Sequence, residues 1–191
     1  MSNPQRTGLA EAPGLTVAVA TPADLAEAGT VMRAVLHADL GGYRPQWHSD
    51  LDDLEAAYLR RPGCVLVVAR DESGIVGTAA VKPCLLASPP NPDWLAHEYN
   101  QPDVCQLVRV WVAARARRRG VGRALAGKAV SWSTGPGGYR RVYLHTDASV
   151  PGAETFWRSL PTREIHDCRP DPYHTVHFEI DVDALLRAPG C

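Results

Sequence analysis

The stretch Arg117-Arg118-Arg119-Gly120-Val121-Gly122 lies between a predicted strand, residues 104–112, and a predicted helix, residues 120–133. A strand that runs into a glycine-containing turn and then a helix leaves several backbone N–H groups unpaired, and the helix dipole adds partial positive charge there. The glycines let the backbone approach an anion, and the arginines, with Arg123, supply charge-assisted hydrogen bonds. The stretch therefore predicts a pyrophosphate site.

Three phosphate-binding patterns compete for this stretch. A dinucleotide fingerprint would need glycine at position 125, which is Leu125. A P-loop fits through Gly127 and Lys128, but the next residue is Ala129 rather than Ser or Thr, and these residues fall within the predicted helix. The third pattern, R/Q-x-x-G-x-G/A after an apolar strand, fits throughout. A solvated helix start would explain the arginines but not the glycines.

The composition places the anion site in an otherwise neutral protein. The chain has 191 residues, 45% of them hydrophobic, and a net charge of -1, so no global field attracts nucleic acid or an anionic membrane. No apolar run reaches the roughly 18 residues of a membrane span. The five cysteines are odd in number and widely spaced, which indicates a reduced, cytoplasmic protein. Residues 1–14 are expected to form a disordered tail before one domain, residues 15–191.

The order of predicted elements indicates one mixed α/β domain with a central sheet. Strands are predicted at residues 16–20, 64–70, 75–82, 104–112, 139–146 and 175–182. Helices are predicted after the capping pair Thr21-Pro22, from Ser49 onward, and at residues 120–133 and 153–160. Residues 83–103 carry five prolines and no periodicity, so a functional or mobile loop is expected there.

Two stretches resemble the GNAT acetyltransferase superfamily. Leu107-Val108-Arg109-Val110-Trp111-Val112, followed by residues 117–125, is similar to that family's acetyl-CoA motif, and residues 17–24 are similar to its first strand and helix. The resemblance covers residues 15–182. It implies a mostly antiparallel sheet that is splayed at the cofactor site and flanked by helices. It further implies acetyl-CoA as cofactor, a primary amine of a small molecule or peptide as acceptor, direct attack in a ternary complex, and a homodimer.

The resemblance also implies a set of cofactor contacts. The strand would pair with the amides of pantetheine, and the diphosphate would lie on the N–H groups of residues 118–123. The residues assigned to cofactor binding are Val110, Trp111, Val112, Arg117, Arg118, Arg119, Gly120, Val121, Gly122, Arg123, Ala124 and Phe156.

The catalytic positions depart from the family pattern. Acetyl transfer to an amine requires removal of its proton, since a lysine-like amine has a pKa near 10.4. Members of the family often use Glu as base and Tyr as acid, but this chain has Gln106 and Trp157 at those positions. The candidate replacement bases are His145, Asp147, His48, His97, Glu98 and Asp103. For each of them, a role as a surface or capping residue is the favoured interpretation. A module that binds acyl-CoA without catalysis therefore remains the alternative.

The sequence gives little information about the acceptor. Residues 43–48 and the proline-rich segment fall where the family shapes its acceptor pocket. The acids Asp50, Asp52, Asp53 and Glu55 either favour a cationic amine or form a solvated helix start. His174 and His177 would face opposite sides of a strand, so no metal site is predicted.

Overall fold

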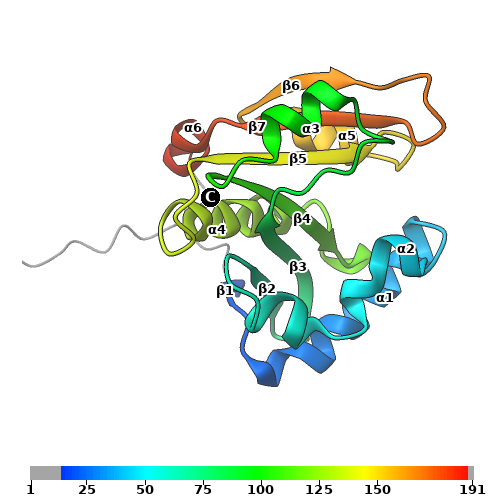
Figure 1. Cartoon of the computed structure of the whole chain (residues 1–191). Coiled ribbons are helices and arrows are strands. Elements are labelled where there is room, and N and C mark those ends of the chain that lie inside the picture. Colours follow the sequence, from blue (N-terminus) through cyan, green and yellow to red (C-terminus); the bar gives the residue numbers. More distant parts are fainter. Residues whose placement is uncertain (1–13, 189–191) are drawn as a thin grey trace, which may run out of the picture.

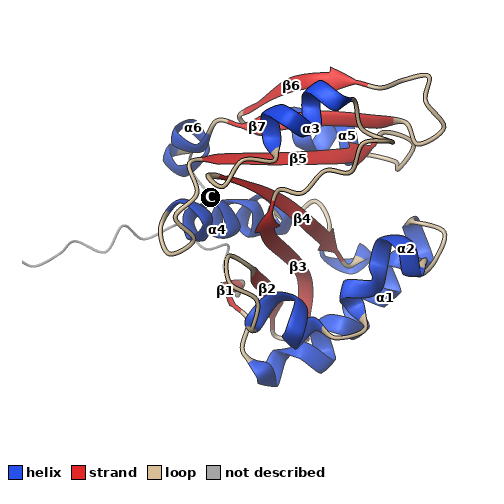
Figure 2. Cartoon of the chain, viewed as in Figure 1, coloured by secondary structure: helices blue, strands red, loops and turns tan. Residues whose placement is uncertain are grey.

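The computed structural model describes residues 14–188 and shows a seven-stranded sheet flanked by helices (Figures 1 and 2). The strands are β1 Thr16–Val19, β2 Val65–Asp71, β3 Gly74–Pro83, β4 Val104–Val112, β5 Arg141–Asp147, β6 Thr162–Asp167 and β7 Thr175–Ile180. Their order is β1-β2-β3-β4-β5-β7-β6, and only the β4–β5 pair is parallel. The predicted α/β domain with a mostly antiparallel sheet is confirmed. The expected tail, residues 1–14, lies outside the described residues except for Gly14.

Helices cover both faces of the sheet. They are α1 Leu25–Asp39, α2 Pro45–His48, α3 Asp93–Tyr99, α4 Val121–Thr134, α5 Ala153–Arg158 and α6 Val182–Arg187, with short turns at Pro22–Asp24, Ser49–Leu51, Glu55–Leu59 and Ala114–Ala116. On one face α4 packs its buried residues, such as Leu125 and Val130, against β2, β3 and β4. On the other face α1 covers β2 and β3, and α3 packs against β5. No helix of residues 14–188 is long and apolar enough to span a membrane.

The sheet separates into two halves after a short parallel pairing. β4 pairs with β5 only through residues 104–106 opposite residues 141–143, and beyond this point the two strands diverge (Figure 1). A bulge at Arg109, whose φ is 57°, shifts the register between β3 and β4 and increases the local twist. Among residues 14–188, the β4 edge therefore has no strand partner past Gln106 on the β5 side.

Several elements differ from the sequence-based prediction. The helix expected from Ser49 is divided into two short helical segments, Ser49–Leu51 and Glu55–Leu59, because Asp53 accepts the Ala56 N–H and starts the second segment anew. The proline-rich segment contains α3, which begins after Pro92 and is too short for periodicity to reveal. β6 and α6 were also not predicted. The last predicted strand ends early because Asp181 caps α6, accepting a hydrogen bond from the Ala184 N–H at 2.9 Å.

Candidate active site

The loop before α4 is an anion cradle built from the backbone. Arg118 and Gly120 both have left-handed φ angles, 62° and 79°, which turn the chain sharply before α4 begins at Val121. Within residues 14–188, none of the backbone N–H groups of residues 118–123 has an acceptor. Successive unpaired N–H groups at a helix start form an anion site.

The arginines of the loop differ in their roles. Arg117 forms an ion pair with Asp39 of α1 and donates to the Val112 carbonyl at 3.0 Å. Arg119 reaches Asp71 at 3.3 Å, and Arg123 donates to the Ser159 carbonyl at 3.0 Å. These contacts fix the loop to three other parts of the fold. The Arg118 guanidinium has no partner among the described side chains and is free to bind an anion.

The two glycines of the loop are required for different reasons. Gly120 faces open space, so its positive φ, rather than crowding, favours glycine. A Cβ at Gly122 would lie 3.1 Å from the Phe156 ring and 3.8 Å from Val112. Gly122 thus allows α5 to approach α4 beside the free edge of β4.

A polar cluster lies where β4 and β5 diverge. Gln106 Nε2 lies 3.3 Å from His145 Nδ1, and the Tyr143 hydroxyl lies 3.2 Å from the same atom. Tyr143 also contacts His177 Nδ1 at 2.6 Å, and His177 Nε2 lies 3.2 Å from Cys168 Sγ. The cluster connects β4, β5 and β7 on the sheet face opposite α4.

The hydrogen bonds indicate which tautomer His145 adopts. Tyr143 has one hydroxyl proton, and the shorter contact directs it to His177, so the Tyr143 oxygen accepts from His145 Nδ1–H. This tautomer requires the Gln106 amide to present its oxygen, rather than the nitrogen placed there, to the same Nδ1–H. The lone pair of His145 then resides on Nε2, which has no protein partner in the described structure. That atom can accept a proton.

His145 is exposed to solvent yet lies deep between the two halves of the sheet. The surrounding protein, and after it the neighbouring His177 imidazole and the charges of Lys82 and Arg109, lower the pKa of His145 well below its ordinary value. The ring is therefore neutral at pH 7. A neutral, accessible imidazole held by a hydrogen bond to its second nitrogen has the properties of a general base.

The structure does not bring Trp157 or Asp147 into this cluster. Trp157 is buried in the apolar core that α4 and α5 share, on the opposite face of the sheet. Asp147 accepts hydrogen bonds from the Ser149 N–H at 2.8 Å and the Ser149 hydroxyl at 2.6 Å. It stabilises the turn that follows β5.

The remaining candidate bases are also placed elsewhere. His48 is buried and accepts the Arg44 N–H at Nδ1 at 2.9 Å, so it stabilises the start of α2. Glu98 is paired with Arg141 at 2.9 Å. His97 is exposed on α3, and Asp103 caps the start of β5 through its carbonyl, which accepts from the Arg140 and Arg141 N–H groups.

A hollow of about 250 Å³ lies beside the polar cluster, between the α2 region and β3 and β4. Arg109 lines it and is held by Asp50 through contacts of 2.9 and 2.6 Å. Lys82, which also lines the hollow, is paired in the sheet register with Gln106. Their side chains therefore project from the same face of the sheet.

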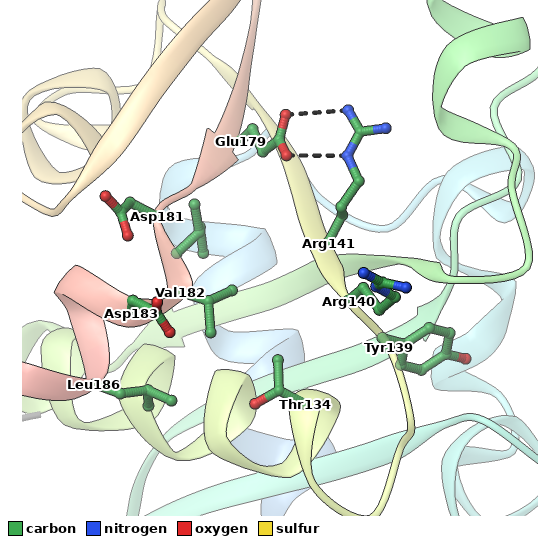
Figure 3. Close-up of a pocket in the computed structure, with 10 residues that line it drawn as sticks. Thr134, Tyr139, Arg140, Arg141, Glu179, Asp181, Val182, Asp183 and Leu186 are labelled. Atoms are coloured by element: carbon green, nitrogen blue, oxygen red, sulfur yellow. Dashed lines mark hydrogen bonds and ion pairs between the residues drawn. The ribbon is translucent and has the colours of Figure 1, made fainter.

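A larger hollow, about 510 Å³, lies at the other end of β5, near α6 (Figure 3). Figure 3 shows Arg141 paired there with Glu179, at 3.0 Å, beside Asp181 and Asp183. This hollow lies away from both the anion cradle and His145, at the opposite ends of α4 and β5. We therefore take the divergence of β4 and β5 as the candidate active site.

Acid stability provides a test of the buried part of the cluster. Burial, and then the charge of His166, lowers the pKa of His177 to about 4 from 6.5. Below pH 6.5 the unfolded chain binds a proton at His177 that the folded chain does not bind. The stability contribution is thus complete above pH 6.5 and is lost as the pH falls toward 4. We expect the titration of His177 alone to lower the free energy of unfolding by about 2 kcal/mol between pH 7 and pH 5.

Urea unfolding at pH 7 and pH 5 measures this loss. His177→Gln, which keeps an acceptor for Tyr143, should lose less stability on acidification than the wild type. The exposed His37 of α1 gives the control, and His37→Gln should behave as the wild type does. An equal loss in all three proteins would contradict the assignment.

Sequence reasoning missed Tyr143, His177, Lys82 and Arg109 as members of the site. Tyr143 and His145 alternate along one strand, which places them on the same face, and this signal was available in the sequence. The pairing of β7 with β5, which brings His177 to Tyr143, and the bulge that turns Arg109 toward Asp50 have no local sequence signature.

A sheet split after its one parallel strand pair, with an anion cradle at the start of the next helix, defines a class of acyltransferases. Residues 32–160 match the model of the Acetyltransferase (GNAT) family, and the chain belongs to that family. The predicted family and the prediction of an acyltransferase are therefore confirmed.

Individual relatives support the fold. A human N-acetylaspartate synthetase is 28% identical over 135 residues, which are 71% of this chain but only 37% of that protein. A spermidine N-acetyltransferase from Vibrio cholerae, solved with CoA and spermine, has a TM-score of 0.63 at 14% identity and covers 91% of this chain and 99% of that one. A GCN5-related N-acetyltransferase from Kribbella flavida has a TM-score of 0.57 at 25% identity and covers 87% and 96%.

Proposed function

We propose that this chain transfers an acetyl group from acetyl-CoA to the primary amine of a small molecule, by direct attack in a ternary complex, with His145 as general base. The observation that carries the proposal is the position of His145. It is neutral, open to solvent, and held by Tyr143 and Gln106 where β4 and β5 diverge.

The residues around the cradle fit acetyl-CoA. The N–H groups of residues 118–123 and the free Arg118 suit a diphosphate, and the unpaired edge of β4, at residues 110–112, suits the amides of pantetheine. Phe156, against Gly122, closes the apolar side of the opening. When bound, acetyl-CoA supplies a thioester that an amine can attack.

The side chains of the cluster have different roles in the proton transfer. Nε2 of His145 accepts the proton from the amine nitrogen, whose acidity rises as its lone pair attacks the carbonyl. Tyr143 holds the His145 ring through Nδ1 and stabilises the imidazolium that forms. Burial raises the pKa of Tyr143 far above its ordinary value, so its hydroxyl keeps its proton throughout. Trp157 takes no part in this step, because the CoA thiolate is a good enough leaving group to depart without being protonated by an acid.

The names of the relatives do not select one acceptor. Spermidine is a polycation, whereas the amine in N-acetylaspartate belongs to a dicarboxylate. The test is therefore incubation with acetyl-CoA and a panel of amino acids, polyamines and peptides, read by release of the CoA thiol. We expect turnover on at least one small amine.

A second candidate is a module that binds acyl-CoA without transfer. It is favoured by Gln106, which cannot act as a base, and by Trp157, which is buried in the core. Binding of acetyl-CoA in calorimetry, with no thiol release on any amine of the panel, would favour this module over the enzyme.

A further inference from the structure

The hollow beside His145 carries uncompensated positive charge. Its charged lining consists of Lys82, Arg61, Arg109 and one acid, Asp50. Asp50 is fully engaged, because Arg109 contacts both of its oxygens and the Tyr58 hydroxyl also donates to it. Arg109 and Asp50 therefore neutralise each other, and two positive charges remain.

The other acids near the hollow are also occupied. Asp52 accepts the Tyr43 hydroxyl at 2.5 Å, Asp53 accepts the Ala56 N–H at 2.9 Å, and Glu55 is paired with Arg60. These contacts stabilise the turns after α2. The acids that could have favoured a cationic amine thus serve local structure.

Lys82 is the group without a partner. It is half-buried, and in the described structure no acid or other acceptor contacts its ammonium group; the same holds for the Arg61 guanidinium. Burial lowers the pKa of Lys82, and the charge of Arg109 adds to the effect, with Arg61 acting in the same sense and Asp50 and Cys84 opposing it. A buried ammonium group is stabilised by an anion brought next to it.

The geometry connects this charge to the reacting centre. Lys82 on β3 is the register partner of Gln106 on β4, and Gln106 contacts His145 on β5. Neighbouring strands lie about 4.8 Å apart, so β3 and β5 lie about 10 Å apart across β4, and the long Lys82 side chain and the imidazole are within reach of one small molecule. We propose that the acceptor is an amine that also carries a carboxylate, of the amino acid type, with Lys82 and Arg61 binding the carboxylate and His145 facing the amine.

This inference rests on the proposed function, and it adds a link between binding and catalysis. The positive charges of Lys82 and Arg109 contribute to the low pKa of His145. A carboxylate bound at Lys82 offsets part of that charge and makes His145 a stronger base when the correct acceptor is present. A polyamine would add positive charge at the same place and weaken the base.

Substrate comparison tests the proposal through activity. Glycine and L-aspartate should be acetylated at least 10-fold more efficiently, in kcat/KM, than glycinamide or spermidine. Lys82→Met should raise the KM for the amino acids about 10- to 100-fold, the loss of one charge-assisted contact, and should leave the KM for glycinamide, which has no carboxylate, within about twofold. Lys82→Arg should restore part of the preference. Lys128→Met, on α4 and on the opposite face of the sheet, should retain wild-type kinetics.

A binding measurement makes the test independent of turnover. Lys82 and Lys128 are the only lysines in the sequence, so protein labelled with ¹³C-lysine gives two side-chain signals, assigned with Lys128→Met. Titration with glycine or L-aspartate should shift the Lys82 signal and raise its pKa, while glycinamide and spermidine should not.

The outcomes separate the inference from the proposed function. Turnover that favours glycinamide or spermidine, with no dependence on Lys82, would overturn the carboxylate site and leave the acetyltransferase intact. A Lys82 shift with amino acids but no thiol release on any amine would retain the carboxylate site and reject transfer. The absence of both would reject both.

Discussion

Replacing His145 with alanine is expected to lower kcat about 100-fold while leaving the affinity for acetyl-CoA within about twofold of the wild type. A positioned general base typically contributes 10²- to 10⁴-fold to a rate, and His177, the other imidazole of the cluster, is buried and cannot replace His145 at the substrate. The affinity is preserved because the anion cradle, residues 118–123, is formed by the backbone. Steady-state kinetics and calorimetry measure the two quantities.

Two comparisons distinguish a base from a structural residue. His97→Ala removes an exposed histidine of α3 and should leave kcat unchanged. Because His145 is open to solvent, added imidazole can enter the space left by His145→Ala and should restore part of the rate. If His145→Ala keeps most of its activity, or if imidazole has no effect on a strongly impaired variant, the base lies elsewhere.

The cradle was predictable from the sequence because it is a local feature. The signals are contiguous: a strand, arginines, two glycines and a helix, all within residues 104–134. The physical roles of the glycines were not predictable. Gly122 accommodates Phe156, a contact between distant segments, and Gly120 is required for its φ angle.

The catalytic cluster was only partly predictable because its members come together through strand pairing. Gln106 and His145 were both candidates, but they are 39 residues apart, and their contact depends on the parallel pairing of β4 with β5. The sequence likewise could not show that Asp50 is neutralised, since this requires the bulge that turns Arg109 toward it. Counting the acidic residues of this segment, without knowing their ion pairs, therefore predicts a negative hollow where the structure leaves positive charge.

The second large effect is expected at the cradle, where Gly120→Glu should weaken acetyl-CoA binding about 100-fold. Two causes contribute. A non-glycine residue at a φ of 79° costs roughly 1–2 kcal/mol of conformational strain. The added carboxylate also lies beside the N–H groups of residues 118–123, where it competes with and repels a diphosphate. At an effective dielectric constant of about 20, two unit charges 4 Å apart repel by about 4 kcal/mol, so screening can remove about 30% of the repulsion and still leave about 2.8 kcal/mol, which is about 100-fold in affinity.

Gly138→Glu separates the two causes. Gly138 has a φ of 71° and, like Gly120, has no atom within 4 Å of a Cβ, but it lies in the loop between α4 and β5. Both variants should therefore lose similar stability in urea unfolding, while only Gly120→Glu should lose affinity in calorimetry. Equal affinities in the two variants would show that the diphosphate does not bind at the start of α4, and the acetyl-CoA site would have to be sought at another anion-binding surface of the fold.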